Sequence, residues 1–510
     1  MNGSSVEQAT SYPCRMSLDP RTPVLIGAGQ FVNKATGLDD ALDASSLMAE
    51  AIKAAATDAG LTEVPNPDSL RVVGLLCWNY GDPAFVVAER LGLSPRQTAV
   101  STMGGNSPQT LVNTTALQIL RGELDLAILT GGEAWKSRSR FRKHDVTPDW
   151  PKAPADRMPD LLGEDLVMNH EAELARGIRL PVQVYPMFET AIRAKAGRTP
   201  EQHLKVISEL WSRFSEVAAS NPYAWSREPK TAEEIRTAGP ANRMIGLPYT
   251  KYMNSNLDVD MAAALIMCSA AKAESLGVPR DRWVFPHSGS DCHEHPFISN
   301  RWSFADTPAV ELGGRRALEL AGLTMADIDI VDLYSCFPSA VQLGAQSLGL
   351  SLEQQLTRTG GLPFAGGPWN NYVMHAIATV MRELRDAPGT NGLVWANGGY
   401  TTKHAFGVYS TEPPKVPFRH AYPQDEIDAM PRREVAKPAE AAGQRATLEA
   451  YSVMHGRDGA PEMIHAACIL ADGRRACGES TDASLGREMC ASEFVGKAVD
   501  LDASGVFHVV

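Results

Sequence analysis

Short apolar segments that stop at glycines recur along this chain, and they restrict the fold more than any other feature of the sequence. Residues 124–130 are nearly all apolar and end at a pair of glycines, and residues 71–78 and 97–102 have the same character. Helical patterns, such as that of residues 47–60, separate the segments. Strands without alternation of polar and apolar residues are typical of a parallel sheet that helices cover on both faces. The first part of the chain is therefore predicted to be α/β.

The same order of strand, glycine turn and helix returns in the second half. Segments with the apolar pattern of buried strands return at residues 261–277, 328–333 and 392–396. Residues 135–250 differ, because they are rich in charged residues and proline and carry helical patterns such as 201–219. The sequence therefore predicts a duplicated α/β fold, with residues 135–250 inserted on the sheet and not continuing it.

The C-terminal region has a third character. Residues 413–442 contain six prolines, a density that marks a linker. Beyond them, short runs alternate in a β-like manner, and residues 471–473 (Ala-Asp-Gly) form a hairpin signal. Residues 443–510 are predicted to form a small, mostly antiparallel, OB-like β-barrel.

Charge and composition exclude several classes of function. The 510 residues carry a formal net charge of −12, which gives no general attraction to nucleic acid or anionic membranes. No apolar run approaches the roughly 18 residues that span a bilayer, and the N-terminus lacks a signal-peptide pattern. The eight cysteines form no Cys-x-x-Cys pair, which favours reduced thiols. We expect a cytoplasmic protein without a membrane span.

The predicted barrel is a poor candidate for nucleic-acid binding. Such barrels need a basic face with stacking aromatic residues. Residues 443–510 contain only Tyr451, Phe494 and Phe507 as aromatics, and acidic residues are plentiful. We therefore expect the barrel to pack within the molecule or to cover a pocket.

Five segments of the chain resemble characteristic segments of the thiolase family in their order and spacing. They are GELDLAILTGGEAW, the stretch 254–277, GLTMADIDIVDLYSCF, GGLPFAGGPWNN and GLVWANGGY. Residues 185–224 look most like the sterol-carrier-protein-2 type of thiolase. The resemblance runs from residue 20 to residue 412 and implies an N-terminal half at 20–290 and a C-terminal half at 291–412.

The resemblance implies a specific architecture and chemistry. Thiolases have a duplicated fold of α/β/α/β/α layers and a loop domain, here 135–250, that holds coenzyme A. They transfer acyl groups or perform Claisen chemistry on CoA thioesters. A cysteine thiolate at a helix N-terminus attacks the thioester, and a histidine takes its proton. A second cysteine abstracts a proton from the acyl carbon, and an Asn–water pair with a histidine stabilises the oxyanions.

The catalytic positions of the family carry different residues in this chain. By the resemblance, the nucleophilic cysteine falls on Gly104, the Asn or His of the next motif on Tyr334, the base on Gly367 and the second cysteine on Ala396. The hydroxyl groups near Gly104 are expected to cap the following helix, because no general base accompanies them. The chain is therefore predicted to be inactive in the standard thiolase reaction.

Three functional hypotheses follow from these substitutions. The first is a thiolase homologue that binds CoA thioesters without condensing or cleaving them, with no other cofactor. The second is a CoA-ester carbon–carbon lyase or acyltransferase that uses Tyr334 with His375 or His404. The third is a non-enzymatic scaffold for acyl-CoA enzymes. Cys336, Asn397 and Tyr400 are further polar residues of the same loops.

The stretch HSGSDCHEH brings together ligand types that suit zinc, in His287, Cys292, His293 and His295. Their spacing matches no standard metal motif, so we expect a polar loop between the two halves and no metal.

Thiolases usually dimerise through the strand before the nucleophile, which corresponds to residues 96–102. A homodimer is therefore the family default, and a monomer stays open.

Overall fold

Two mixed β-sheets form the centre of the molecule in the computed structural model, which describes residues 18–510. The first sheet has the order β1 (Pro23–Val32), β8 (Asp260–Ser269), β4 (Leu126–Ala134), β2 (Ser69–Val72), β3 (Gln97–Ser101) and β5 (Asp160–Leu162). The second sheet has the order β10 (Ile330–Leu333), β11 (Asn391–Gly398), β12 (Lys403–Ser410), β9 (Phe285–His293) and β13 (Arg419–Ala421). The expectation of an all-parallel sheet is wrong, because β8 runs antiparallel to both of its neighbours and β11–β12 is a hairpin.

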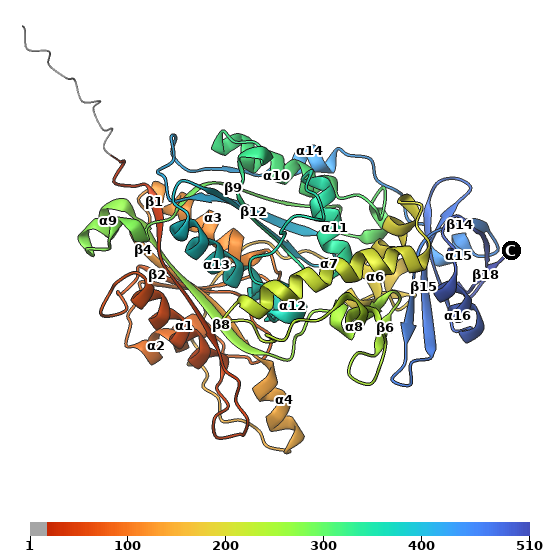
Figure 1. The fold of residues 1–510 in the computed structure, drawn as a ribbon, viewed down its shortest axis with the longest axis horizontal. Coiled ribbons are helices and arrows are strands. Elements are labelled where there is room, and N and C mark those ends of the chain that lie inside the picture. The colour runs from red at the N-terminus through yellow and green to blue at the C-terminus, as the bar shows by residue number, and fades with distance from the viewer. Residues whose placement is uncertain (1–17) are drawn as a thin grey trace, which may run out of the picture.

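Helices cover both faces of both sheets and produce five alternating layers (Figure 1). The outer layer on the first sheet contains α1 (Ala44–Asp58) and α2 (Pro83–Leu91). The layer between the sheets contains α3 (Ser107–Leu120) and α13 (Tyr372–Asp386). The outer layer on the second sheet contains α10 (Pro308–Ala321) and α11 (Pro338–Ser347). The predicted α/β/α/β/α order is therefore confirmed.

Strand β8 shows how the sequence produces this layering. All ten of its residues are buried. Alternate side chains of a strand point to opposite faces of the sheet. Ala262, Ala264 and Ile266 accordingly join the apolar cluster beneath α1, whereas Leu265 and Met267 join the cluster between the sheets. A strand buried on both faces favours an uninterrupted apolar sequence, which is the pattern that residues 261–268 show.

Most of the stretch 287–295, which was expected to be a polar loop, belongs to the β9 strand (Phe285–His293) inside the second sheet. The polar sequence is compatible with burial because its serines have partners on α10. Ser288 donates to the carbonyl of Ala317, and Ser290 donates to the carbonyl of Gly313, each at 2.6 Å. Hydrogen-bonded hydroxyl groups can be buried at little cost.

The insertion at 135–250 is mainly helical but also contributes to the sheets. Its strand β5 pairs in parallel with β3, with Val100 opposite Leu161, so a segment of the same chain covers the edge of β3. This pairing differs from the expectation, which placed residues 135–250 on the sheet and not within it. The helices are α4 (Trp135–Lys143), α5 (Glu171–Leu174), α6 (Pro181–Lys195), α7 (Pro200–Ser220) and α8 (Ala232–Arg236), and the short strands β6 (Met244–Gly246) and β7 (Tyr249–Thr250) follow. The connecting helices α9 (Ala270–Ser275) and α12 (Gly361–Phe364) lie later in the chain.

A third, antiparallel sheet forms the C-terminal end of the molecule (Figure 1). Its order is β16 (Arg475–Ser480), β15 (Pro461–Leu470), β14 (Arg445–His455), β17 (Ala498–Leu501) and β18 (Phe507–Val509), with α16 (Ala483–Ala491) packed against it. One bridge between Glu479 and Val506 joins the two ends of this order, so the sheet curls on itself. Residues 413–442, the expected linker, contain β13, α14 (Gln424–Asp428) and α15 (Pro438–Ala441).

A buried arginine fastens the C-terminal sheet to the core. Arg475 is fully buried and forms an ion pair with Glu449, with Nε 2.7 Å from a carboxylate oxygen. Its Nη1 donates to the carbonyls of Ser299 and Arg301 in the layered α/β core. The insertion adds a second connection, because Met454 of β14 pairs with Gly246 of β6.

We expect Arg475→Met to lower the free energy of unfolding by about 3 kcal/mol, because it leaves a partly buried carboxylate and two carbonyls without their donor. Arg445→Met is the matched control, since the Arg445–Asp500 pair of the same sheet is exposed and should contribute little to stability. Urea unfolding followed by circular dichroism measures both. Equal losses for the two variants would contradict this role of Arg475.

Candidate functional site

Loops from both halves of the fold converge at the N-terminus of α3. The backbone N–H of Gly104 donates to the side-chain oxygen of Asn370 at 3.0 Å. A Cβ atom placed on Gly105 would lie 2.5 Å from the hydroxyl of Tyr334, and one placed on Gly398 would lie 3.1 Å from the Cα of Gly104. The positions that correspond to the thiolase nucleophile, its oxyanion motif and the last glycine loop therefore lie together.

Gly104 occupies a place in which a side chain does not fit. Its φ is +153°, a backbone conformation that residues with a side chain rarely adopt. A Cβ there would lie 2.3 Å from Oδ1 of Asn106 and 3.0 Å from both Cε and Nζ of Lys403. Real Cβ atoms do not approach neighbours to 2.3 Å, so a cysteine at this position would require the side chains of Asn106 and Lys403 to move. Lys403 fills the space beside the missing side chain.

Lys403 is the one residue of this site that sequence reasoning missed altogether. It is the first residue of β12, lies opposite Gly398 and is 5% exposed. Its Nζ donates to the carbonyl of Met103, and no carboxylate within the described residues forms an ion pair with it. Burial lowers the pKa of the Lys403 amine, an effect that the charge of Asp165 opposes. The sequence signal that could have pointed to Lys403 was a positively charged residue at the start of an otherwise mostly apolar strand.

The other three altered positions have distinct surroundings. Tyr334 is buried and packs edge to face on Tyr372, with ring centroids 5.6 Å apart. Burial, and then the neighbouring Cys336, raise the pKa of Tyr334 well above its ordinary value, so its hydroxyl stays protonated. Ala396 is fully buried in β11. Gly367 donates its N–H to the carbonyl of Asn256 at 2.9 Å and provides no side chain to the Gly104 loop.

The two candidate histidines lie in different environments. His375 is on α13, and its Nδ1 lies 2.8 Å from Oε1 of Gln30 on β1. Burial lowers the pKa of His375 to about 3. His404 follows Lys403, and its Nδ1 accepts from the indole N–H of Trp395 at 3.3 Å. Burial, and then the charge of Arg301, lower the pKa of His404 well below 6.5. Each of the two histidines thus has a structural partner, and the ring of His404, which bonds to Trp395, lies on the opposite face of β12 from Lys403.

The remaining polar residues of these loops attach the loops to the insertion. Asn397 donates to the hydroxyl of Tyr185 at 3.2 Å, and the Tyr400 hydroxyl donates to the carbonyl of Arg179 at 2.7 Å. Burial raises the pKa of the Cys336 thiol to about 12, so this cysteine is not a thiolate at neutral pH. These groups hold the site together without providing a nucleophile.

The residues that suggested a zinc site are spread along β9 and the turn that follows it. His287 contacts the carbonyl of Glu412, whereas the Cys292 thiol donates to the carbonyl of Ala309. Successive side chains of a strand point to opposite faces, which separates His293 from Cys292. Over residues 18–510, no cluster of three or more potential metal ligands is present.

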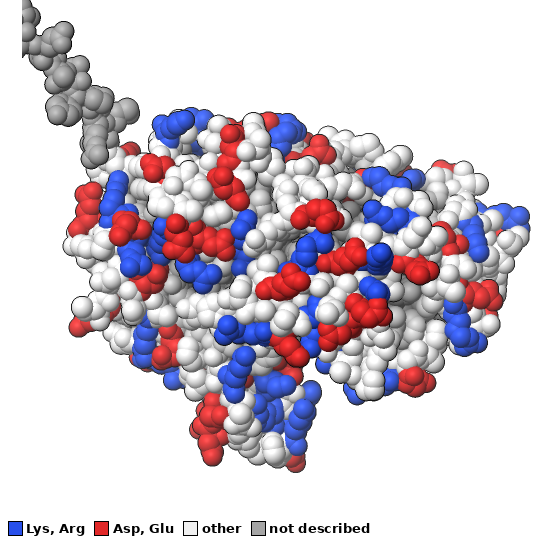
Figure 2. Space-filling model, viewed as in Figure 1, with Lys and Arg blue, Asp and Glu red and all other residues white. Residues whose placement is uncertain are grey.

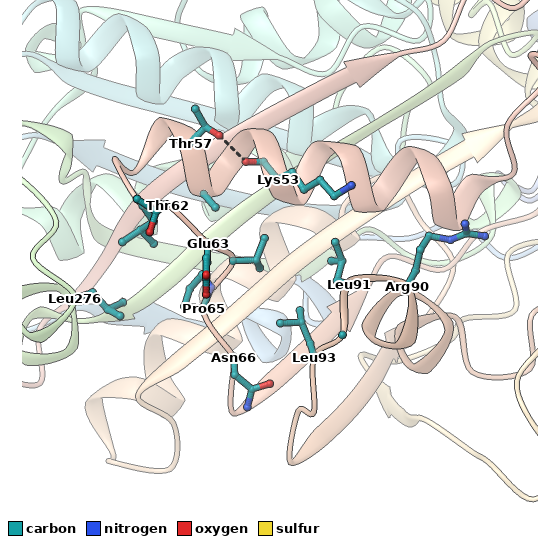
Figure 3. A pocket seen from close by; sticks show the side chains of 14 residues that line it. Lys53, Thr57, Thr62, Glu63, Pro65, Asn66, Arg90, Leu91, Leu93 and Leu276 are labelled. Carbon is teal, nitrogen blue, oxygen red and sulfur yellow. Dashed lines mark hydrogen bonds between the residues drawn. The ribbon is translucent and has the colours of Figure 1, made fainter.

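Two cavities border the loop that contains Gly104. One, of about 210 Å³, lies at the N-terminus of α3, and Lys403 and His404 are among its lining residues. The other, of about 290 Å³, lies beside Met103 and Trp78. Tyr334 lines neither of them. A larger groove of about 820 Å³ beside α1, drawn in Figure 3 with Lys53 and Arg90 among its lining residues, includes no residue of the Gly104 loop.

Charge is intermixed over the face that Figure 2 shows, apart from a gathering of Lys and Arg over α4. In the described part of the chain, helices of the length and apolar character needed to cross a bilayer are absent.

The buried His375 should make stability depend on pH. The pKa of this group is about 3 in the folded chain, and its ordinary value is 6.5. As the pH falls below about 6.5, the unfolded chain binds a proton at His375 that the folded chain does not, so stability is lost. His375→Asn should therefore lose less stability than the wild type between pH 6.5 and pH 4.5 in urea unfolding. His508→Asn is the exposed control, and identical pH profiles for the His375 variant and the wild type would contradict the prediction.

Comparisons with known proteins agree with this geometry. The family model described as "Thiolase-like protein type 1 additional C-terminal domain" matches residues 423–506, and thus begins inside the expected linker. The crystal structure of a monomeric SCP2-thiolase like protein type 1 from Mycobacterium smegmatis is 30% identical, with a TM-score of 0.81 over 97% of this chain and 100% of that one. The dimeric peroxisomal thiolase of Saccharomyces cerevisiae shares the fold, at 17% identity and a TM-score of 0.56 over 77% of this chain and 98% of that one.

An acetyl-CoA acetyltransferase from Methanothermobacter thermautotrophicus is 25% identical over 250 residues, which are 46% of this chain and 62% of that enzyme. The match thus spans less than two thirds of this curated relative. The full-length similarity to the mycobacterial protein, the five layers and the additional C-terminal sheet lead to one assignment. The chain belongs to the thiolase superfamily, as an SCP2-thiolase-like protein with an additional C-terminal domain.

Proposed function

We propose that this thiolase homologue binds CoA thioesters but does not carry out thiolysis or Claisen condensation. The observation that carries the proposal is the position of Lys403, whose Nζ occupies space that a side chain at residue 104 would need. A thiolase cysteine at this position is stabilised as an anion by the helix N-terminus. Here the same place holds a glycine and an amine, which supply no thiolate for acyl transfer.

The positions that provide the other catalytic groups of a thiolase site also lack a suitable side chain in this chain. Ala396 stands at the position of the second cysteine and Gly367 at that of the base, as the resemblance aligns them. Cys336 is a poor substitute nucleophile, because burial raises the pKa of its thiol to about 12. Members of a catalytic unit act together, so the loss of several has a much larger effect than any one replacement can reverse.

The proposed ligand class comes from the relatives. The curated proteins that match include two acetyl-CoA acetyltransferases and a 3-ketoacyl-CoA thiolase, and their names describe action on CoA thioesters. The lyase hypothesis receives less support from the geometry. Tyr334 lines neither cavity beside Gly104, and His375 is engaged by Gln30. The geometry therefore favours binding over a mechanism based on Tyr334.

The proposal is tested by measuring thiolysis of acetoacetyl-CoA together with the binding of acetyl-CoA by calorimetry. We expect heat of binding and no thiolysis above the background rate. Thiolysis at the rate of an active thiolase, run in parallel as the positive control, would refute the catalytic part. A flat titration with acetyl-CoA would refute the binding part.

Restoring the cysteine alone should not restore activity. Gly104→Cys should lower the free energy of unfolding by about 2–4 kcal/mol, because of steric overlap and an unfavourable φ. Gly197→Cys is the matched control: its φ is +64° with no atom within 4 Å, so it should cost only about 1–2 kcal/mol. Adding Lys403→Ala to Gly104→Cys should recover part of the loss. Wild-type stability and acetoacetyl-CoA thiolysis by Gly104→Cys alone would contradict this account of the site.

We further propose that the protein is a monomer. By the resemblance, thiolases dimerise through the strand at residues 96–102, and β5 of the same chain pairs with this strand here. The similar mycobacterial protein is described as monomeric, whereas the yeast thiolase is described as dimeric. Backbone groups already paired within a sheet do not offer an edge to a second chain.

Sedimentation equilibrium should therefore give a mass near 55.0 kDa at micromolar concentration. A concentration-independent mass of twice that value would show that another surface supports a dimer and would refute the proposal.

A further inference from the structure

A cavity of about 370 Å³ lies beside the first turn of α10, and α14 and the last turn of α11 also contribute to its wall. The helices α10 and α14 lie side by side along the upper edge of Figure 1. None of the lining residues belongs to the Gly104 loop, and none also lines either of the two cavities that border that loop. The cavity is therefore separate from the thiolase-like site.

One residue of the cavity wall is a buried arginine with unused donors. Arg301 is 3% exposed, and its Nη2 donates to Oγ1 of Thr402 at 2.9 Å. The other two nitrogens of its guanidinium, Nε and Nη1, have no partner within residues 18–510. The ring of Phe188 lies 5.4 Å from Cζ of Arg301 and presents an aromatic face without an anion. Buried charges are normally paired, because desolvation of an unpaired ion is expensive.

The same wall contains a buried carboxyl group that is also incompletely paired. Glu294 is 2% exposed and accepts a hydrogen bond from the backbone N–H of Ala309, in the first turn of α10, at 3.0 Å. Burial raises the pKa of Glu294 to about 7, an effect that the charge of Arg301 opposes. Among the ion pairs of the described residues, none joins Glu294 to Arg301. Two opposite charges thus line one cavity without contacting each other.

The other carboxylates of the wall are paired or face solvent. Asp306 pairs with Lys195 and accepts a hydrogen bond from Gln346 at 3.0 Å. Glu311 is exposed. Neither of these groups therefore competes with Glu294 and Arg301 as the buried, incompletely satisfied charges of the cavity.

A histidine of the wall has a free ring atom. His295 is 7% exposed, and its Nε2 has no partner within the described part of the chain. The charged groups that act on the ring of His295 include Arg432, Asp428 and Arg301. A ring nitrogen can donate or accept according to the tautomer, so His295 can bond to either end of a charged ligand.

The rest of the wall suits an apolar group. Pro308, Ile427, Met430 and Pro431 line it, together with Trp302, which is 56% exposed. The volume of about 370 Å³ lies in the lower part of the range of small-molecule sites, roughly 300–1,000 Å³. A compact ligand with an apolar part and two charged groups matches this wall.

We propose that this cavity binds a small zwitterion, an α-amino acid with an apolar side chain. The carboxylate of the ligand pairs with the guanidinium of Arg301, whose planar fork matches two carboxylate oxygens. The ammonium group of the ligand pairs with the carboxylate of Glu294, and the side chain contacts Trp302 and the apolar residues. An ion of a single charge is attracted by one of the two buried groups and repelled by the other. Both groups are satisfied only by a ligand that carries both charges.

Calorimetric titration of the full-length wild type with L-leucine tests the proposal. Isocaproate, which lacks the amino group of leucine, and isoamylamine, which lacks its carboxylate, are the matched analogues. Leucine should bind at least about tenfold more tightly than either analogue, because each analogue leaves one buried charge without its partner. Equal affinities for leucine and an analogue would overturn the proposal, and so would the absence of binding heat with leucine, methionine and phenylalanine alike.

Two variants assign the binding to this cavity. Glu294→Gln keeps an acceptor for the N–H of Ala309 but removes the charge, so leucine should then bind no more tightly than isocaproate. Arg301→Lys keeps the charge but removes the planar fork, and it should weaken leucine binding. Arg315→Lys and Glu319→Gln are the matched controls, because they form an exposed pair on α10 outside the wall. Unchanged leucine binding in Glu294→Gln, or an equal loss in the controls, would overturn the proposal. The comparison of analogues on the wild type needs no variant to fold.

Binding in this cavity is independent of the proposed function, because the two sites share no lining residue. A flat titration with acetyl-CoA would refute the proposed CoA binding and leave the amino-acid site intact. Leucine should bind with the same affinity in the presence of acetyl-CoA, and competition between the two would overturn the assignment to a separate cavity.

Discussion

The site depends on a close backbone contact between two glycines that lie almost three hundred residues apart. Any Cβ on Gly398 would lie 2.5 Å from the side chain of Asn106 and 3.1 Å from the Cα of Gly104. The absence of side chains at both positions lets the β11–β12 hairpin reach the N-terminus of α3. Residue 403, directly opposite Gly398, is thereby brought to the place of a nucleophile. The positions of the Gly104 loop and of Lys403, and the shape of the cavity beside them, all follow from this contact.

The exchange of cysteine for an adjacent lysine reverses the electrostatics of the site. A helix N-terminus stabilises an anion, which is why a thiolate is well placed there. The same dipole destabilises an ammonium group, and burial has the same effect. The same position of the fold therefore stabilises the charge of a thiolate in one case and disfavours the charge of an ammonium group in the other. This reversal needs no change in the backbone architecture, and the five layers are retained.

The layered fold could be predicted from the sequence because its strands are apolar on both faces, as β8 illustrates. The positions of Gly104, Tyr334 and Ala396 could be aligned with the family by resemblance, because the first two lie in recognisable loops and the third lies in the strand that leads into one. Strand β9 was missed because its serines, which bond to carbonyls of α10, have the composition of a loop. Lys403 was missed for a different reason. It matters because it lies close to Gly104, and a contact between residues so far apart in the sequence leaves no local pattern. The pairing of β5 with β3 is likewise a contact between distant segments with little pattern of their own.

The pairing of β6 with β14 also has a consequence for the order of assembly during synthesis. The ribosome produces Gly246 about two hundred residues before Met454, its partner in the ladder. Contacts between such distant segments form slowly, and domains generally fold as they emerge. The β6 strand of the insertion therefore pairs with β7 alone while the whole second half of the core is made. The contact between the insertion and the C-terminal sheet thus forms only after β14 has been made, and it joins two regions of the fold that are synthesised far apart in time.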